Sequence, residues 1–301
     1  MPERLPFIDP HVHLWDLSHI RYPWLMPPFA DDGPNGSVEP IAADYGLDDY
    51  LRDAGSWQVR GIVHVDAGAD PADALKETDW LQDMANARGM PNAIVAFAAL
   101  DDPDVEALLA RQAERPNVRG IRHIVNWHAD PQRTYSAHDV TQSEAWQAGF
   151  GLLAKYGLSF DLQAYPGQFA TLASLIARHP DTPVIINHAG MMVREEGREE
   201  WRAGMTALAG LPHVAVKISG IGFAFRPWDI EQARRYVLET IGLFGTDRAM
   251  FASNFPTDKL FGSFDQHLDA YNAIVGDFGD ADRHALFAGN ANRIYRLGLE
   301  L

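Results

Sequence analysis

Eight short apolar segments recur along the chain, and each is followed by a helical pattern or a long loop. Most are rich in Val, Ile or Phe and have Gly or Pro nearby, which is typical of buried parallel strands. The clearest are VRGIVHVD at 59–66 and VRGIRHIV at 118–125. The predicted strands are Phe7–Leu14, Gly61–Ala67, Ala93–Leu100, Gly120–Asn126, Leu158–Tyr165, Pro183–His188, Val214–Ile221 and Met250–Phe255.

Amphipathic stretches between these segments carry the start and stop signals of helices. Asp73–Arg88 ends before Gly89, and Gly167–His179 stops at Pro180. The other predicted helices are Asp104–Glu114, Ser143–Tyr156, Asp229–Phe244 and Asp280–Tyr295. Strands that alternate with helices imply a parallel sheet of the α/β class, and eight such units favour a closed (β/α)8 TIM barrel. An open doubly wound sheet is the alternative, but no glycine-rich nucleotide loop follows the first strand.

The length of 301 residues suits one barrel, so we expect a single domain over residues 1–301. A formal net charge of −16 repels nucleic acid and anionic membrane surfaces, and we expect neither as a partner. Without cysteine the chain has no thiolate nucleophile and no thiolate metal site. The sequence shows no signal peptide and no membrane-length apolar run, which predicts a soluble, cytoplasmic protein. A homodimer is left open.

Two long segments interrupt the alternation of strands and helices, and both follow strand ends. Residues 16–46 are rich in Pro, Gly and aromatic side chains, including Trp24, and residues 126–143 are polar and contain Trp127. Active sites of barrels lie at the C-terminal ends of the strands, so both segments should lie over the site. Long ordered loops are usually functional, although packing alone is the alternative. We expect Trp24 and Trp127 to cover a pocket there.

Three histidines lie at strand ends. His11 and His13 belong to the sequence DPHVH at 9–13, and the period of two along a strand points both imidazoles to one side. Two imidazoles on one face can bind one metal ion or one substrate oxygen. His188 ends the sixth predicted strand and should face the same pocket. Hydrogen-bonded core histidines are the alternative for all three.

Other polar candidates lie at the ends of the fourth, fifth and eighth strands. Arg122 could grip a substrate carboxylate with two hydrogen bonds, or form an internal ion pair. Gln163 and Tyr165 alternate along the fifth strand and could reach the mouth of the barrel. Asn254 ends the eighth strand, and Asp258 just beyond it could be a base, a metal ligand or a loop cap.

Together these motifs resemble the amidohydrolase-related proteins, TIM-barrel hydrolases that include sugar-lactone hydrolases and 2-pyrone-4,6-dicarboxylate lactonase. The resemblance covers nearly the whole chain. It rests on FIDPHVHLW at 7–15, the segment 118–125, NHAG at 187–190, VKISG at 216–220 and FASNFPTDK at 251–259.

In that superfamily the His pair, a sixth-strand His and an eighth-strand Asp surround the reacting water. The resemblance therefore implies catalytic roles for His11, His13 and His188. Members that bind a metal tightly add a fifth-strand His, where this chain has Gln163, and the lactonase branch can work without metal. We accordingly expect either no cofactor or one divalent ion, with zinc favoured, on His11, His13 and His188.

The eighth-strand Asp of the family falls where this chain has Asn254, which cannot accept a proton. The nearest candidate base is Asp258, and Asp66 and His188 are alternatives.

The expected reaction is the opening of a lactone by activated water. The histidines would hold the carbonyl oxygen or one Zn²⁺, and Asp258 or a neutral His would take the proton. Arg122 would fix a carboxylate or hydroxyl of the small-molecule substrate. The alternatives are a metal-dependent decarboxylase, a C–N hydrolase, and a non-catalytic small-molecule binder, which Asn254 motivates.

Overall fold

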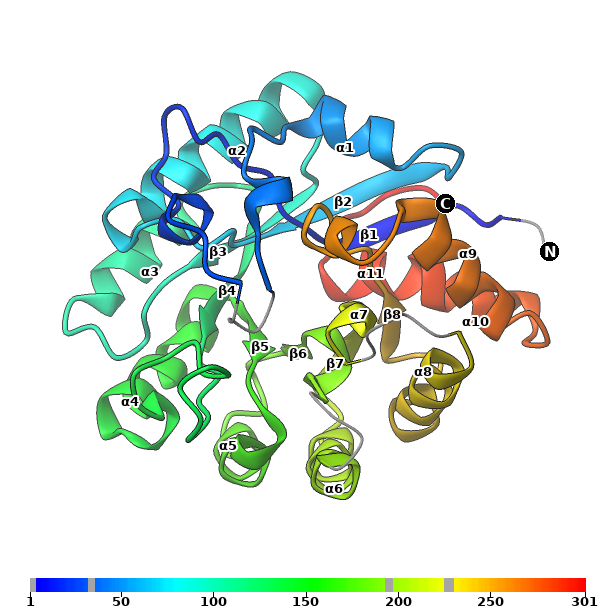
Figure 1. The fold of residues 1–301 in the computed structure, drawn as a ribbon. Helices are drawn as coiled ribbons and strands as arrows, with labels where there is room; N and C mark the ends of the chain where they lie inside the picture. The colour runs from blue at the N-terminus through cyan, green and yellow to red at the C-terminus, as the bar shows by residue number, and fades with distance from the viewer. Residues whose placement is uncertain (1–3, 32–35, 193–196, 225–229) are drawn as a thin grey trace.

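The computed structural model describes residues 4–31, 36–192, 197–224 and 230–301. Its centre is one sheet of eight strands, all parallel and hydrogen-bonded in chain order, and helices surround it (Figure 1). The strands are β1 (Phe7–Val12), β2 (Val59–Val65), β3 (Ala93–Phe97), β4 (Val118–Ile124), β5 (Ser159–Gln163), β6 (Val184–Ile186), β7 (Val214–Ile218) and β8 (Ala249–Phe251). Each predicted strand contains or overlaps one of these, and the predicted TIM barrel is confirmed.

The two ends of the sheet meet beyond β8. Val12 and Phe255 form a parallel bridge, and the backbone N–H of His13 donates to the Phe255 carbonyl at 2.8 Å. The N–H of Asn254 donates to the His11 carbonyl at 2.9 Å. These bonds join β1 to the segment after β8 and bring His11, His13 and Asn254 to one place at the carboxyl end of the barrel.

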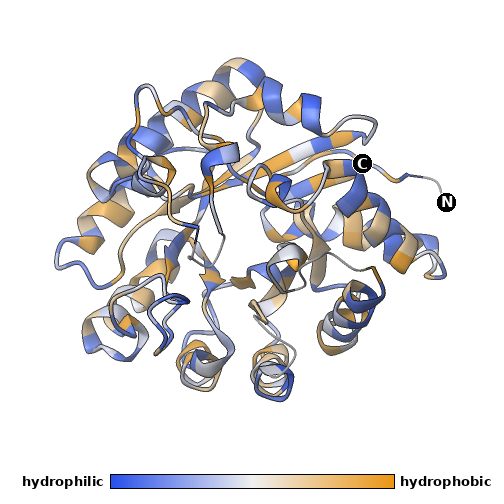
Figure 2. Ribbon diagram, in the orientation of Figure 1, coloured by the Kyte–Doolittle hydropathy of each residue, from blue (hydrophilic) through white to orange (hydrophobic). Residues whose placement is uncertain are grey.

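The helices lie outside the strands, and Figure 2 shows hydrophilic residues along them. They are α1 (Leu47–Asp53), α2 (Ala74–Arg88), α3 (Val105–Ala113), α4 (Glu144–Leu152), α5 (Phe169–Ile176), α6 (Arg198–Ala209), α7 (Ile221–Ala224), α8 (Ile230–Phe244), α9 (Phe264–Ile274), α10 (Asp280–His284) and α11 (Asn290–Ile294). A π-helical turn, Ala285–Gly289, joins the last two. Short 3₁₀ turns lie at Pro23–Leu25, Glu39–Ile41, Pro71–Asp73, Val140–Gln142, Leu153–Tyr156, Pro166–Gln168, His188–Gly190 and Thr257–Leu260.

All six predicted helices are found, although α5 is shorter than expected. Asp229, the first residue of one predicted helix, lies outside the described residues. The sequence analysis does not predict the helices α1, α6, α7 and α9. No helix in the described ranges is long and apolar enough to cross a membrane.

The barrel interior holds a buried ion pair between β5 and β7. Lys217 on β7 and Asp161 on β5 are both fully buried, and their charged groups contact one another directly. The Tyr295 hydroxyl donates to Asp161 Oδ1 at 3.0 Å, and Lys217 Nζ lies 3.3 Å from the Pro10 carbonyl oxygen. Two charges removed from water need such partners, because each would be costly to bury alone.

Candidate active site

A pocket of about 250 Å³ opens at the carboxyl ends of the strands. Its wall includes six residues predicted from the sequence: His13, Trp24, Arg122, Gln163, His188 and Asn254. It also includes Ala67, Gly68, Ile124, Tyr135, Met191 and Thr257, which sequence reasoning did not single out. Two other predicted residues, Trp127 and Tyr165, line a second pocket of about 690 Å³. His11 and Asp258 are buried and do not reach the wall of the first pocket.

The imidazoles of His11 and His13 lie on the same side of β1, with their Nε2 atoms 3.2 Å apart. Nδ1 of His13 lies 2.8 Å from the Val65 carbonyl oxygen, which can only accept, so Nδ1 carries the hydrogen. The lone pair of His13 Nε2 is therefore directed at the site. Burial, reinforced by the nearby charge of Arg122, lowers the pKa of His13 to about 3, so the ring is neutral.

Asn254 stands between His13 and Asp258. Its Nδ2 donates to Asp258 Oδ1 at 2.7 Å, which turns its Oδ1 toward His13 Nε2 at 3.2 Å. The other Asp258 oxygen accepts from the Gly220 N–H at 3.0 Å, and burial raises the pKa of this carboxyl to about 7. The chain turns back after β8, since the Asp258 N–H donates to the Asn254 carbonyl. Asp258, expected as a base at the pocket, is thus separated from it by one amide group.

Two acceptor atoms, His13 Nε2 and Asn254 Oδ1, approach within 3.2 Å. A cation held by both atoms would relieve their repulsion, and so would protonation of Asp258 together with a turned-over Asn254 amide. Ligands at 2.0–2.1 Å from a tetrahedral zinc ion lie about 3.3 Å apart, which the spacing of these atoms and of His11 Nε2 matches. No group of three His, Asp or Glu side chains in the described ranges is arranged for a metal. The donors that fit one ion are two imidazoles and one amide oxygen.

His188 lies two residues after the end of β6, with its ring centroid 4.6 Å from that of His11. Its Nδ1 lies 3.0 Å from the Ser219 hydroxyl, which comes just after β7. Burial lowers the pKa of His188 well below its ordinary value, and the charges of Arg122 and Lys217 add to this effect. His188 therefore presents a neutral imidazole to the pocket.

Backbone strain is concentrated at the same rim. Five of the described non-glycine residues have a positive φ. Four of these lie at the rim, with φ between 46° and 57°: His188, Ala189, Met191 and Asn254. Such conformations are costly for residues with a Cβ and persist where the surroundings enforce them. Here they place two predicted site residues on the pocket wall.

The sequence left two roles open for Arg122, an internal ion pair and a contact with substrate. Arg122 forms an ion pair with Asp66 and also lines the pocket. Its Nε lies 3.2 Å from Asp66 Oδ2, its Nη1 donates to Gln163 Oε1 at 3.0 Å, and its Nη2 contacts the Asp66 carbonyl. The guanidinium is therefore held from several sides. A fixed positive group beside neutral imidazoles suits a reacting atom that gains negative charge.

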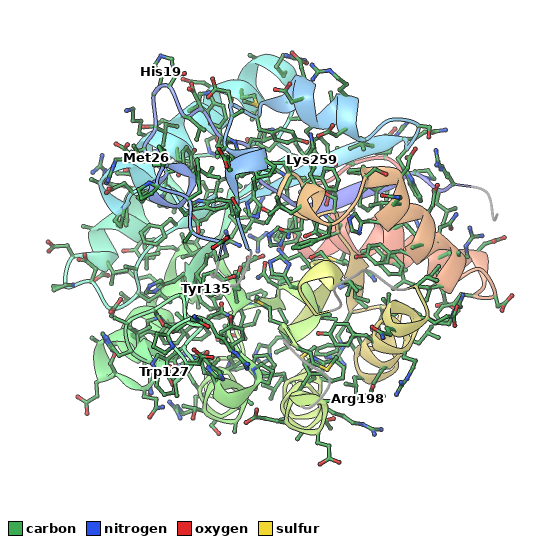
Figure 3. All side chains as sticks on the ribbon, viewed as in Figure 1. His19, Met26, Trp127, Tyr135, Arg198 and Lys259 are labelled. Carbon is green, nitrogen blue, oxygen red and sulfur yellow. The ribbon has the colours of Figure 1, made fainter. Side chains whose placement is uncertain are left out.

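Trp24 covers one edge of the pocket, as expected from its loop. Its Nε1 donates to the Ala67 carbonyl after β2 at 2.8 Å, and its ring meets Trp15 edge to face at 5.6 Å. Gly68 has φ +73°, and a Cβ there would lie 3.0 Å from the Trp24 Nε1. Tyr135 forms another part of the wall, and Figure 3 shows it nearer the barrel centre than Trp127.

Comparison with known proteins places the chain in a family. The family model for amidohydrolases matches residues 8–297. The uncharacterized protein y4mH of Sinorhizobium fredii is 42% identical over 97% of this chain and 99% of its own length. An L-fucono-1,5-lactonase of Burkholderia ambifaria is 26% identical over 96% of this chain and 95% of its own length.

A solved structure shows the same barrel. An amidohydrolase from Burkholderia multivorans, crystallised with bound zinc, is 25% identical and has a TM-score of 0.80 over 97% of this chain and 99% of its own. The match over residues 8–297, on a barrel with histidines and an arginine in one pocket, shows that this chain is an enzyme of the amidohydrolase family, a hydrolase.

Proposed function

We propose that this enzyme hydrolyses the ester bond of a lactone by attack of a water molecule. One observation carries the proposal: a single small pocket holds the neutral imidazole of His188 together with the fixed guanidinium of Arg122. Opening of a lactone needs a proton acceptor for the water and a positive group for the developing oxyanion. Similarity to two L-fucono-1,5-lactonases, at 26% and 27% identity, supports this substrate class.

In this proposal His188 accepts the proton of the attacking water, because a base must be unprotonated at the working pH. The lone pair of His13 Nε2 is already directed at Asn254 and His11. Arg122 stabilises the charge that develops on the carbonyl oxygen or binds a carboxylate of the substrate. Asp258 acts through Asn254, whose amide it orients.

A single divalent ion also fits the proposal. The zinc-bound structure of the Burkholderia multivorans relative supports it, and the ligands here would be His11 Nε2, His13 Nε2 and Asn254 Oδ1. His188, the third ligand expected from the sequence, is assigned to the water instead. When bound, such an ion polarises a carbonyl oxygen and lowers the pKa of water.

The experiment is hydrolysis of a panel of aldonolactones and carboxylated lactones, followed with a pH indicator. His188→Gln should lower kcat by about 10²–10⁴-fold, the usual contribution of a general base. His213→Gln is the control, because the His213 ring bonds the backbone carbonyl of Ile176 at the end of α5 and lines neither pocket. Wild-type turnover in His188→Gln would refute the assignment of the base, and no turnover of any lactone by the wild type would refute the function.

The same assay with a chelator tests whether hydrolysis requires a metal ion. Turnover that is lost on chelation and restored by zinc would support the ion on His11 and His13. Turnover that is unchanged after complete removal of metal, verified by elemental analysis, would contradict it. Release of carbon dioxide from an aromatic carboxylate, without lactone turnover, would favour the decarboxylase alternative.

A further inference from the structure

The second pocket, of about 690 Å³, has no role in the proposed reaction. It lies beside the first, because neighbouring residues line the two: Met191 lines the first pocket and Met192 the second. The ring of Tyr135 in the first pocket lies 6.4 Å, centroid to centroid, from the ring of Tyr165 in the second. Trp127, on the second pocket, lies farther from the barrel centre than Tyr135 (Figure 3). A ligand in the second pocket would therefore lie next to a substrate in the first.

Gln168 fixes the wall of the second pocket. This buried side chain accepts through Oε1 from the backbone N–H groups of Trp127 at 3.1 Å and Tyr165 at 3.0 Å. Its Nε2 donates to the Val125 carbonyl and to Asp139 Oδ1, both at 2.8 Å. The four bonds join the loop after β4 to the loop after β5. A surface held in this way before binding loses little conformational freedom when a ligand arrives.

The lining offers an aromatic face together with both donors and acceptors. Trp127 is 37% exposed although it lies in a concavity, and Tyr165 lies in the same wall. The His128 Nδ1 accepts from the Asp130 N–H at 2.9 Å, so the neutral ring carries its hydrogen on Nε2 as a donor. Glu200 adds an acceptor. A sugar ring presents an apolar C–H face to an indole and hydroxyls that both donate and accept.

The charge of the second pocket differs from that of the first. Two carboxylates, Asp139 and Glu200, line it, and Arg133, the guanidinium among its described lining residues, is paired with Asp130 at 3.2 Å. An anionic group would meet these carboxylates, whereas a neutral hydroxylated ring would not be repelled. The first pocket, which holds Arg122, suits the reacting end of the substrate.

We propose that the second pocket binds a neutral, polyhydroxylated ring attached to the lactone, so that the enzyme acts on glycosylated aldonolactones. This inference rests on the proposed lactone hydrolysis. Trp127 stacks on the face of the ring, and His128 and Glu200 bind its hydroxyls. The chemistry of the lactone itself stays in the first pocket.

The test compares cellobiono-1,5-lactone, which has two rings, with glucono-1,5-lactone, which has one. The wild type should have the higher kcat/KM for the two-ring lactone, and Trp127→Ala should lower that value about tenfold, as expected for a lost stacking contact. The value for the one-ring lactone should not change. Trp127→Phe should restore most of the difference, and Leu51→Ala, 38% exposed on α1 and outside both pockets, should change neither value.

The outcomes separate the two proposals. If the wild type hydrolyses the one-ring lactone and the two-ring lactone gives no advantage, or Trp127→Ala affects both equally, the second-pocket proposal is overturned while lactone hydrolysis stands. If neither lactone is hydrolysed, calorimetric titration with cellobiose tests whether the second pocket binds a sugar. Binding that Trp127→Ala weakens about tenfold supports the pocket, and its absence from the wild type overturns it.

Discussion

Replacement of Arg122 gives the sharpest test of how the pocket works. Arg122→Met removes the guanidinium, which contacts Asp66 through two atoms and Gln163 at 3.0 Å. Loss of one donor aimed at a developing oxyanion costs about 10²–10³-fold in kcat. The substitution also leaves the Asp66 carboxylate buried without its charged partner, which costs about 3–5 kcal/mol in the free energy of unfolding.

Arg122→Lys separates these two effects. A lysine keeps the charge near Asp66. It lacks the planar guanidinium that lets Arg122 bind Asp66 and Gln163 at the same time. Arg122→Lys should restore most of the free energy of unfolding, measured by urea titration. It should restore little of kcat, measured on the best lactone at urea concentrations and temperatures where both variants are folded. If Arg122→Met keeps kcat within a few-fold of the wild type, the guanidinium does not act on the reacting oxygen, and the reasoning fails.

Three further predictions concern groups outside the pocket. Lys217→Met and Asp161→Asn should each lower the free energy of unfolding by about 3–5 kcal/mol, and the double variant should lose clearly less than the sum; additive losses would contradict a compensating pair. Gly149→Ala should destabilise by about 1–3 kcal/mol in urea titration, because its Cβ would come 2.0 Å from the Leu100 carbonyl oxygen; unchanged stability would contradict this packing. Burial raises the pKa of Glu77 above its ordinary value of 4.5, so the folded state holds a proton that the unfolded state releases. The free energy of unfolding should therefore fall as pH rises above that value, and Glu77→Gln should flatten the fall; equal slopes for both proteins would refute it.

The fold was predictable because eight apolar segments recur along the chain and six helix patterns alternate with them. The exact strand ends were not, since apolar residues continue past the last paired residue: the first predicted strand runs to Leu14, whereas β1 ends at Val12. Signals for the missed helices existed. Ser263 and Gln266 cap each other at the start of α9, and α6 buries Trp201, Met205 and Leu208 at helical spacing.

The site was predictable where strand geometry decides it. His11, His13 and His188 meet because strand ends of a barrel converge. Asp258 was expected to reach the pocket as a candidate base. The turn after Asn254, which the sequence does not specify, instead places Asp258 behind the Asn254 side-chain amide. Trp127 was expected over the catalytic pocket, but Gln168 holds its backbone at the second pocket. The single domain over 1–301, the homodimer and the cytoplasmic location stay predictions.

The charges around the pocket favour a reaction in which an oxygen atom gains negative charge. Two buried cations, Arg122 and Lys217, each face one carboxylate, Asp66 and Asp161. Beyond the effect of burial, both cations lower the pKa of His188, which keeps that imidazole neutral. The same field that disfavours an imidazolium favours negative charge on a nearby oxygen. In the proposed reaction this field would stabilise an oxyanion, and the proton that His188 takes from water would have to leave the imidazole before the next turnover, which its lowered pKa would promote.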